Sequence, residues 1–82
     1  MASELPNPGQ DIRRRLAERG MKENDLYQFL QRPMREISEI VGGHRDITPE
    51  VAAGLAAALG TTPQYWLDQQ MELDMFQTIR DD

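Results

Sequence analysis

The 82-residue sequence contains no cysteine. A chain without cysteine forms neither a disulfide framework nor a thiolate metal site, and it fits a reducing compartment, so we expect a cytoplasmic protein. The start of the sequence lacks a basic stretch followed by an apolar run, and no run of about 18 apolar residues occurs anywhere. The sequence therefore predicts neither secretion nor a membrane-spanning segment.

Catalytic and metal-binding patterns are also missing. His44 is the only histidine, and it has no cysteine or second histidine with which to share a metal ion. We therefore expect a surface turn residue and no metal site. The carboxylates of Glu36 and Glu39 lie on one helix face, but no nucleophile or base is paired with them. We expect no enzyme activity, no cofactor and no small-molecule substrate.

The net charge of −5 is unevenly divided along the chain. From Arg13 to Arg45 there are eight basic and five acidic residues, whereas from Asp46 onwards there are one basic and seven acidic residues. A local basic segment can attract phosphates even when the whole protein is acidic. Two interpretations stay open: two faces with different partners, or charge that only keeps a small protein in solution.

Proline and glycine divide the sequence into short helical segments with no strand pattern between them. After an extended lead over residues 1–8, the expected helices cover residues 9–20, 22–30, 33–42, 48–60 and 63–80. The pairs Thr48-Pro49 and Thr62-Pro63 are typical helix starts, and Gly20 and Gly60 are typical left-handed caps. Since so short a chain has room for one small core, residues 1–82 are predicted to form one all-α domain of five helices.

Apolar residues at helical spacing predict the core of this domain. The inward residues are expected to include Ile12, Leu16, Leu26, Phe29, Leu30, Ile37, Ile40, Val41, Val51, Leu55, Leu59 and Trp66. The last helix carries more apolar residues than one small core needs. A dimer or partner face is therefore predicted at Leu67, Met71, Met75, Phe76 and Ile79. The alternative is that the methionines fill gaps beneath that helix.

Residues 22–42 have the outline of a helix-turn-helix, in which the second helix enters the major groove of DNA. Arg35 is the predicted reader of guanine, while Met34 can touch a thymine methyl group. Ser38 can donate or accept a hydrogen bond, and Glu39 can accept one from cytosine N4. Phosphate contacts are predicted for Arg32, His44 and Arg45, aided by the backbone N–H groups of Gly42 and Gly43.

From Leu5 to about Phe76 the chain resembles the HigA-type antitoxins, a branch of the Cro/cI-like helix-turn-helix repressors. The resemblance lies in the lead LPNPG, the run ISEIVGGHRDITPE, and LAAALGTTPQYWL followed by DQQMELDMF. It implies a lambda-repressor-like homodimer that binds palindromic operator DNA and represses its own operon. It also implies that the protein binds the toxin encoded beside it, an mRNA-cleaving ribonuclease of RelE-like fold.

The sequence departs from that family at four places. Lys22-Glu23 replaces a Ser-Gln or Thr-Gln pair whose glutamine contacts phosphate, so that Lys22 is the predicted phosphate contact there. Gln31 replaces the turn glycine, Glu36 replaces a small polar residue, and Gly42-Gly43-His44 replaces Asn-Gly-Lys. Fewer phosphate contacts lower both the affinity for DNA and its salt dependence. Two alternatives therefore remain: a helix-turn-helix scaffold that binds a protein and has weakened or lost DNA binding, or a plain phage-type repressor.

Overall fold

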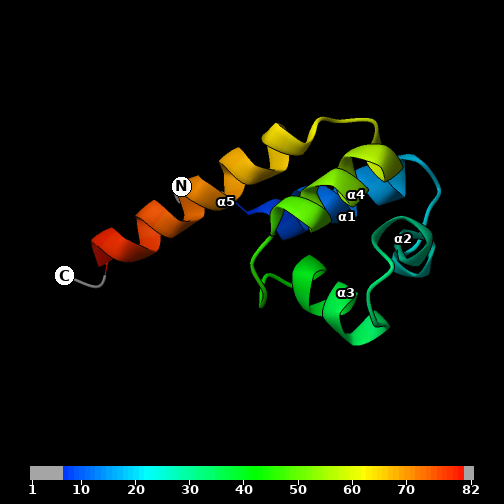
Figure 1. Cartoon of the computed structure of the whole chain (residues 1–82), viewed down its shortest axis with the longest axis horizontal. Helices are drawn as coiled ribbons and strands as arrows, with labels where there is room; N and C mark the ends of the chain where they lie inside the picture. The colour runs from blue at the N-terminus through cyan, green and yellow to red at the C-terminus, as the bar shows by residue number, and fades with distance from the viewer. Residues whose placement is uncertain (1–6, 81–82) are drawn as a thin grey trace.

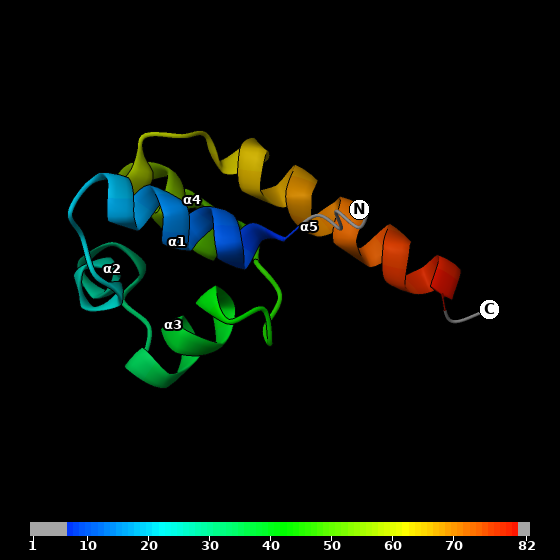
Figure 2. The same cartoon turned by 180° about the vertical axis from the view of Figure 1, so that it is seen from behind.

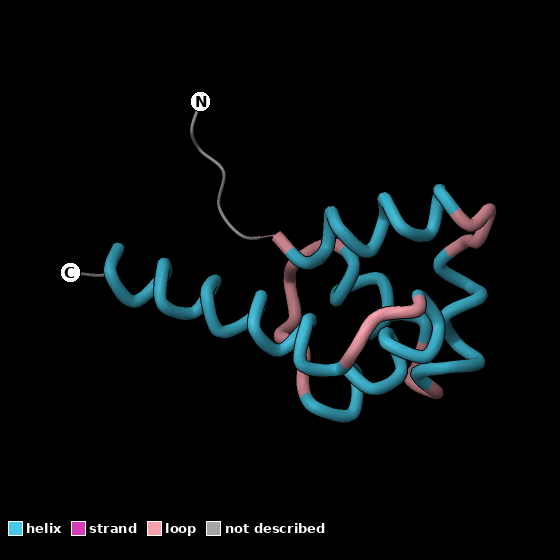
Figure 3. Tube along the Cα trace, turned by 90° about the horizontal axis from the view of Figure 1, so that it is seen from above, coloured by secondary structure: helices cyan, strands magenta, loops and turns pink. Residues whose placement is uncertain are grey.

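A computed structural model describes residues 7–80, with side chains described to residue 75. Its helices are α1 (Pro8–Glu18), α2 (Glu23–Leu30), α3 (Met34–Val41), α4 (Pro49–Leu59) and α5 (Pro63–Arg80). Between residues 7 and 80 the chain forms helices and loops without a strand (Figure 3). The prediction of a five-helix, all-α fold is confirmed.

The helices begin where side chains cap their free N–H groups. Thr48 Oγ1 accepts a hydrogen bond from the backbone N–H of Val51 at 3.4 Å, as the sequence predicts for α4. At α1, the side chain of Asn7 accepts from the N–H of Gln10 at 3.1 Å. Because of this cap, α1 begins at Pro8, which the sequence had placed at the end of the extended lead. Residues 1–6 of that lead lie outside the described residues.

Helix α4 lies in the middle of the fold and packs against α2 and α5 (Figures 1 and 2). Gly54 allows the close approach of α2. A Cβ atom at this position would lie 2.8 Å from the carbonyl oxygen of Phe29 and would overlap Cδ2 of Leu30. The absence of a side chain at Gly54 therefore sets how closely the helix-turn-helix packs on the core.

The core is built from one side chain or more of every helix. Its largest fully buried members are Trp66, Ile12, Leu26, Ile37, Leu55, Leu59 and Val41. Phe29 differs from its predicted inward position, because 42% of its surface is exposed. Since Leu26 and Leu30 fill the side of α2 that faces α4, Phe29 lies at the edge of this contact rather than within it.

A polar cluster joins α1 to the first turns of α5. The carboxylate of Asp11 accepts hydrogen bonds from the hydroxyl of Tyr65 and from Nε2 of Gln69, and it pairs with Arg14 and Arg15. Burial alone would raise the pKa of Asp11, but these hydrogen bonds and the charge of Arg15 outweigh it and hold the pKa below its ordinary value. Asp11 is therefore an ionised anchor between the two helices.

The second half of α5 projects beyond the other four helices (Figures 1 and 3). This projection gives the molecule an elongated shape with extents of 39 × 25 × 23 Å. Among the described helices, none combines the length and the apolar character that crossing a membrane requires.

Candidate nucleic-acid interface

The turn between α2 and α3 is made by Gln31 in the left-handed conformation, with φ 52° and ψ 43°. Its backbone N–H donates to the carbonyl oxygen of Tyr27 at 2.8 Å and so ends α2. This conformation favours glycine, because the Cβ atom of any other residue crowds the backbone. The replacement of glycine by glutamine has therefore left the turn in place, and the fold tolerates the strain.

The start of α2 lies beside α3. The carboxylate of Asp25 accepts a hydrogen bond from the backbone N–H of Lys22 at 2.9 Å, which fixes the first turn of α2 and leaves Lys22 exposed. In that turn, Oε1 of Glu23 accepts a hydrogen bond from Oγ of Ser38 on α3 at 3.2 Å. Lys22 and Ser38 thus belong to one surface, which also includes the carboxylate of Glu23.

Arg35 lies on the outward face of α3. With 100° between successive residues, Arg35 and Glu39 point away from the side on which Ile37 and Val41 are buried. Arg35 is exposed and forms no ion pair with any residue that the structure describes. Its guanidinium is therefore available to a partner.

Met34 corrects an expectation. The sequence placed it on the outward face of α3, but it is half-buried and packs against the core. The reason is helical spacing, because Met34 lies three residues before Ile37 and seven before Val41, both of which are buried. Its side chain has less surface to offer to a thymine methyl group than the outward position would have.

Two of the arginines predicted to contact phosphate form ion pairs within the protein. Nε of Arg45 lies 2.9 Å from Oε1 of Glu39, and Arg32 pairs with Glu50 in the first turn of α4. A hollow of about 310 Å³ lies between these arginines, and half-buried Glu36 also lines it. The arginines are close to α3, but each has a carboxylate as its neighbour.

The turn after α3 is capped by the helix itself. Gly43 has φ 84°, and its N–H donates to the carbonyl oxygen of Ile40, while the N–H of His44 donates to that of Glu39 at 2.8 Å. The N–H of Gly42 likewise donates to Ser38. The N–H groups of Gly42 and Gly43 already donate to carbonyl oxygens of α3, so the predicted phosphate contact, which stays a prediction, would compete with these bonds. His44 is exposed in the turn, as predicted.

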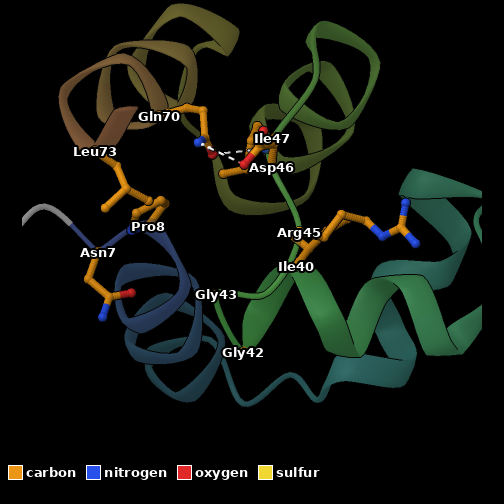
Figure 4. A pocket seen from close by; sticks show the side chains of 10 residues that line it. All are labelled: Asn7, Pro8, Ile40, Gly42, Gly43, Arg45, Asp46, Ile47, Gln70 and Leu73. Carbon is orange, nitrogen blue, oxygen red and sulfur yellow. Dashed lines mark hydrogen bonds between the residues drawn. The ribbon is translucent and has the colours of Figure 1, made fainter. Parts of the chain in front are cut away.

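Gln70 is an anchoring residue that sequence reasoning missed. It is 7% exposed, its Oε1 accepts from the N–H of Ile47 at 2.9 Å, and its Nε2 donates to Asp46 and Asp74. Figure 4 shows this amide beside Asp46 and Ile47, at a hollow of about 220 Å³ between α5 and the loop after α3. The available signal was a glutamine four residues after the buried Trp66, and thus on the inward side of α5.

The charged side chains of the candidate interface and their partners are balanced in sign. The basic residues are Lys22, Arg32, Arg35 and Arg45, and the acidic residues are Glu23, Glu36, Glu39 and Glu50. A surface of this kind attracts DNA phosphates less than the run of basic residues from Arg13 to Arg45 suggests.

The predicted partner face on α5 is divided. Met71 and Met75 are 53% and 58% exposed. Leu67 instead is half-buried and packs against the core. The side chains of Phe76 and Ile79 lie outside the described residues. Within the described part of α5, the exposed apolar surface therefore consists of the two methionines.

Known proteins share both the sequence and the fold. An uncharacterized HTH-type transcriptional regulator of Haemophilus influenzae is 38% identical over 56 residues, which are 68% of this chain and 52% of that protein. The antitoxin HigA-1 of Vibrio cholerae is 37% identical over 54 residues, or 54% of this chain and 51% of that protein. The chain thus spans about half the length of these curated relatives. No family model matches it.

A solved structure covers nearly the whole chain. An addiction module antidote protein of a HigA family from Coxiella burnetii is 30% identical, with a TM-score of 0.84, over 96% of this chain and 87% of that chain. The relatives are named as regulators and antitoxins, not as enzymes. The five helices, the helix-turn-helix and these likenesses together place the chain in the HigA family of helix-turn-helix proteins.

Proposed function

We propose that the protein is a cytoplasmic, DNA-binding antitoxin that represses its own toxin–antitoxin operon as a homodimer and binds a cognate toxin of RelE-like ribonuclease fold. The observation that carries the DNA-binding part is the exposed guanidinium of Arg35 on the outward face of α3, which forms no ion pair with a side chain among residues 7–75. The likeness to the HigA-family antidote protein over nearly the whole chain supports the antitoxin part.

In this proposal α3 enters the major groove and Arg35 donates two hydrogen bonds to O6 and N7 of a guanine. Ser38 and Glu39 lie beside it and contact neighbouring bases. Lys22, Arg32, His44 and Arg45 border α3 and contact the phosphates, which position the protein without reading sequence. Two copies place their α3 helices one turn of DNA apart, about 34 Å, on a palindromic operator.

The toxin is proposed to bind the acidic second half of the chain. The described part of α5 carries Asp68, Glu72 and Asp74, and Met71 and Met75 are exposed among them. Methionine adapts its shape to a partner, and acidic side chains speed association with a basic protein. A basic ribonuclease has the complementary charge.

The DNA-binding part is tested by fluorescence anisotropy with the protein's own upstream DNA and a shuffled duplex of equal length. We expect tighter binding to the native duplex, with an affinity that falls between about 50 and 200 mM salt because phosphate contacts release counterions. Equal affinity for both duplexes would contradict sequence-specific repression.

The role of Arg35 is tested with Arg35→Ala in the same assay. Loss of a bidentate contact to guanine should reduce discrimination between the duplexes by about 1 to 3 kcal/mol, or roughly 5- to 150-fold. Arg13→Ala is the matched control, because Arg13 is an exposed arginine on α1 to which no DNA contact is assigned. Undiminished discrimination by Arg35→Ala would rule out Arg35 as the reader.

A second candidate function is a protein-binding helix-turn-helix scaffold without useful DNA affinity, and the balanced charge around α3 favours it. It predicts no binding to either duplex at low salt, together with a stable complex with the product of the neighbouring gene. Reversal of the charges of Glu72 and Asp74 should weaken that complex. Operator preference without a toxin gene beside this one would instead indicate a phage-type repressor.

A further inference from the structure

Three polar groups assigned to DNA are already bound to carboxylates of the protein. Glu50 pairs with Arg32, Glu39 pairs with Arg45, and Glu23 accepts from the hydroxyl of Ser38. The three glutamates come from three different helices, α4, α3 and α2, and converge on the groups that surround α3.

A carboxylate can bind the side chains of Arg32, Arg45 and Ser38 in the same way as a phosphate. Both are anions with oxygen acceptors that match the planar guanidinium, and a hydroxyl donates to either. A DNA phosphate that contacts Arg32 or Arg45 must therefore displace a glutamate, whose negative charge remains beside the phosphate. The same holds for a phosphate or a base that contacts Ser38 next to Glu23.

Arg35 is different from these groups. It lies on the same surface but forms no ion pair with a residue that the structure describes. The base-reading group is thus available, whereas two of the four side chains proposed to contact phosphate, Arg32 and Arg45, already pair with a carboxylate. Binding that does not depend on the DNA sequence comes almost wholly from phosphate contacts. The ion pairs of Arg32 and Arg45 therefore weaken the attraction to the DNA backbone, and the base contacts determine which DNA is bound.

We propose that Glu23, Glu39 and Glu50 are internal phosphate mimics that hold the affinity for the DNA backbone low, so that binding depends on the bases that Arg35 contacts. This inference rests on the proposed DNA-binding function. It assigns Glu23 and Glu50 a role in specificity without contact with the operator, and it gives Glu39 the same role through its ion pair with Arg45.

Another role must be separated from this one. Glu23 and Glu50 lie in the first turns of α2 and α4, where a carboxylate stabilises the positive end of a helix. A purely structural role predicts that their replacement lowers the melting temperature and leaves DNA affinity unchanged. Glu39 lies within α3 beyond its first turn, so Glu39→Gln alone tests the inference if the other replacements impair folding.

The test compares the wild type with the triple variant Glu23→Gln, Glu39→Gln, Glu50→Gln by anisotropy on the native upstream duplex and on a shuffled duplex. Glutamine keeps the size of each side chain and removes its charge. The matched control replaces Glu18→Gln, Asp68→Asn and Glu72→Gln, three exposed acids outside the interface. Both variants change the net charge equally, so a difference between them comes from the position of the charge.

We expect the interface variant to bind both duplexes roughly tenfold more tightly than the wild type at low salt, with a larger gain than the control. The slope of log affinity against log salt should steepen by about 2, because the charges of Arg32 and Arg45 are no longer cancelled by a glutamate and each neutralises one more phosphate, worth about 0.9. The ratio of the affinities for the native and the shuffled duplex should fall, because contacts with the DNA backbone contribute a larger part of the binding free energy.

The outcomes separate this inference from the proposed function. If the wild type prefers its native duplex and the interface variant behaves like the control variant, the inference is overturned and the proposed function stands. If the wild type binds neither duplex but the interface variant binds both, the inference is supported and operator repression is not. Failure of both proteins to bind at low salt overturns both.

Discussion

Gln31 carries a side chain in a left-handed backbone conformation that favours glycine. A left-handed backbone costs a residue other than glycine roughly 1 to 2 kcal/mol, and Gln31 holds φ 52° at the turn between α2 and α3. The turn persists because the packing of both helices on the core fixes its ends. The strain is therefore stored where the two helices of the candidate interface are joined.

Replacement of Gln31 by glycine should stabilise the protein by roughly 0.5 to 1 kcal/mol, since the strain relieved exceeds the extra freedom gained by the unfolded chain. Urea denaturation measures this change in the free energy of unfolding. Gln31→Ala is the control, because alanine keeps the Cβ atom and should leave stability nearly unchanged. A destabilised Gln31→Gly would show that the glutamine side chain contributes contacts that outweigh the strain.

Asp11 should make stability depend on acidity. Its pKa is lowered in the folded protein, so the unfolded chain binds the proton more tightly. The contribution of Asp11 is therefore complete above its ordinary pKa of 3.8 and is lost as the pH falls below that value, through the lower pKa of the folded state.

Asp11→Asn should remove this contribution and cost about 1 to 3 kcal/mol at neutral pH, because Tyr65 and Arg15 lose a charged partner. Urea unfolding of both proteins at several pH values between 3 and 7 measures the difference. The difference in free energy of unfolding between the wild type and Asp11→Asn should shrink only below about pH 4. A gap that is constant across the range would mean that the charge of Asp11 contributes no stability.

At the scale of the helix, local signals were predicted well from sequence. Thr48 and Thr62 accept hydrogen bonds from the first turns of α4 and α5, because a capping residue and its partner lie only three residues apart. Pairings between helices could not be predicted in this way. The bonds that Ser38 donates to Glu23 and that Ile47 donates to Gln70 depend on how the helices pack, which no local pattern specifies.

The face that a residue occupies was predicted less well at the ends and edges of helices. The position of Met34 follows from its spacing to the buried Ile37 and Val41, whereas spacing alone allows Phe29 either face of α2. The close contact of α2 with α4 at Gly54 decides the position of Phe29. A sequence pattern gives the apolar side of one helix, whereas the depth of a side chain depends on its neighbour.

The contact at Gly54 leads to a prediction for α4. Alanine is the better helix former by about 1 kcal/mol, but its Cβ atom would lie 2.8 Å from the carbonyl oxygen of Phe29. We expect Gly54→Ala to destabilise the protein by about 1 to 3 kcal/mol through overpacking, as measured by thermal unfolding. Ala53→Gly on the exposed side of α4 is the control for propensity. A stabilised Gly54→Ala would contradict the close approach of the helices.

At the scale of the molecule, the projecting half of α5 and the body of four helices offer different surfaces. The body presents α3 and its balanced charges, while α5 presents methionines between acidic residues. Homodimer formation remains a proposal, and α5 is the surface proposed for it or for another partner. Whether α5 binds a second copy or another partner depends on whether the purified protein forms a dimer in the absence of other proteins.

If α5 forms the dimer, Met75→Lys should convert the protein to a monomer, because a buried charge without a partner opposes association. Sedimentation velocity measures the molecular mass. Tyr27→Lys is the control, because Tyr27 is 53% exposed on α2, close to the 58% of Met75. A dimer that persists in Met75→Lys would assign dimer formation to another surface and leave α5 to a partner.

The bond between Ile47 and Gln70 connects the first half of α5 to the loop that follows α3. The amide proton of Ile47 is held by a side chain of α5 rather than by a neighbouring backbone carbonyl, and Ile47 is buried. Its exchange with deuterium from the solvent therefore requires α5 to move away from the loop that follows α3. One amide signal in a spectrum of the protein thus reports how often α5 detaches, with DNA present or with a partner bound.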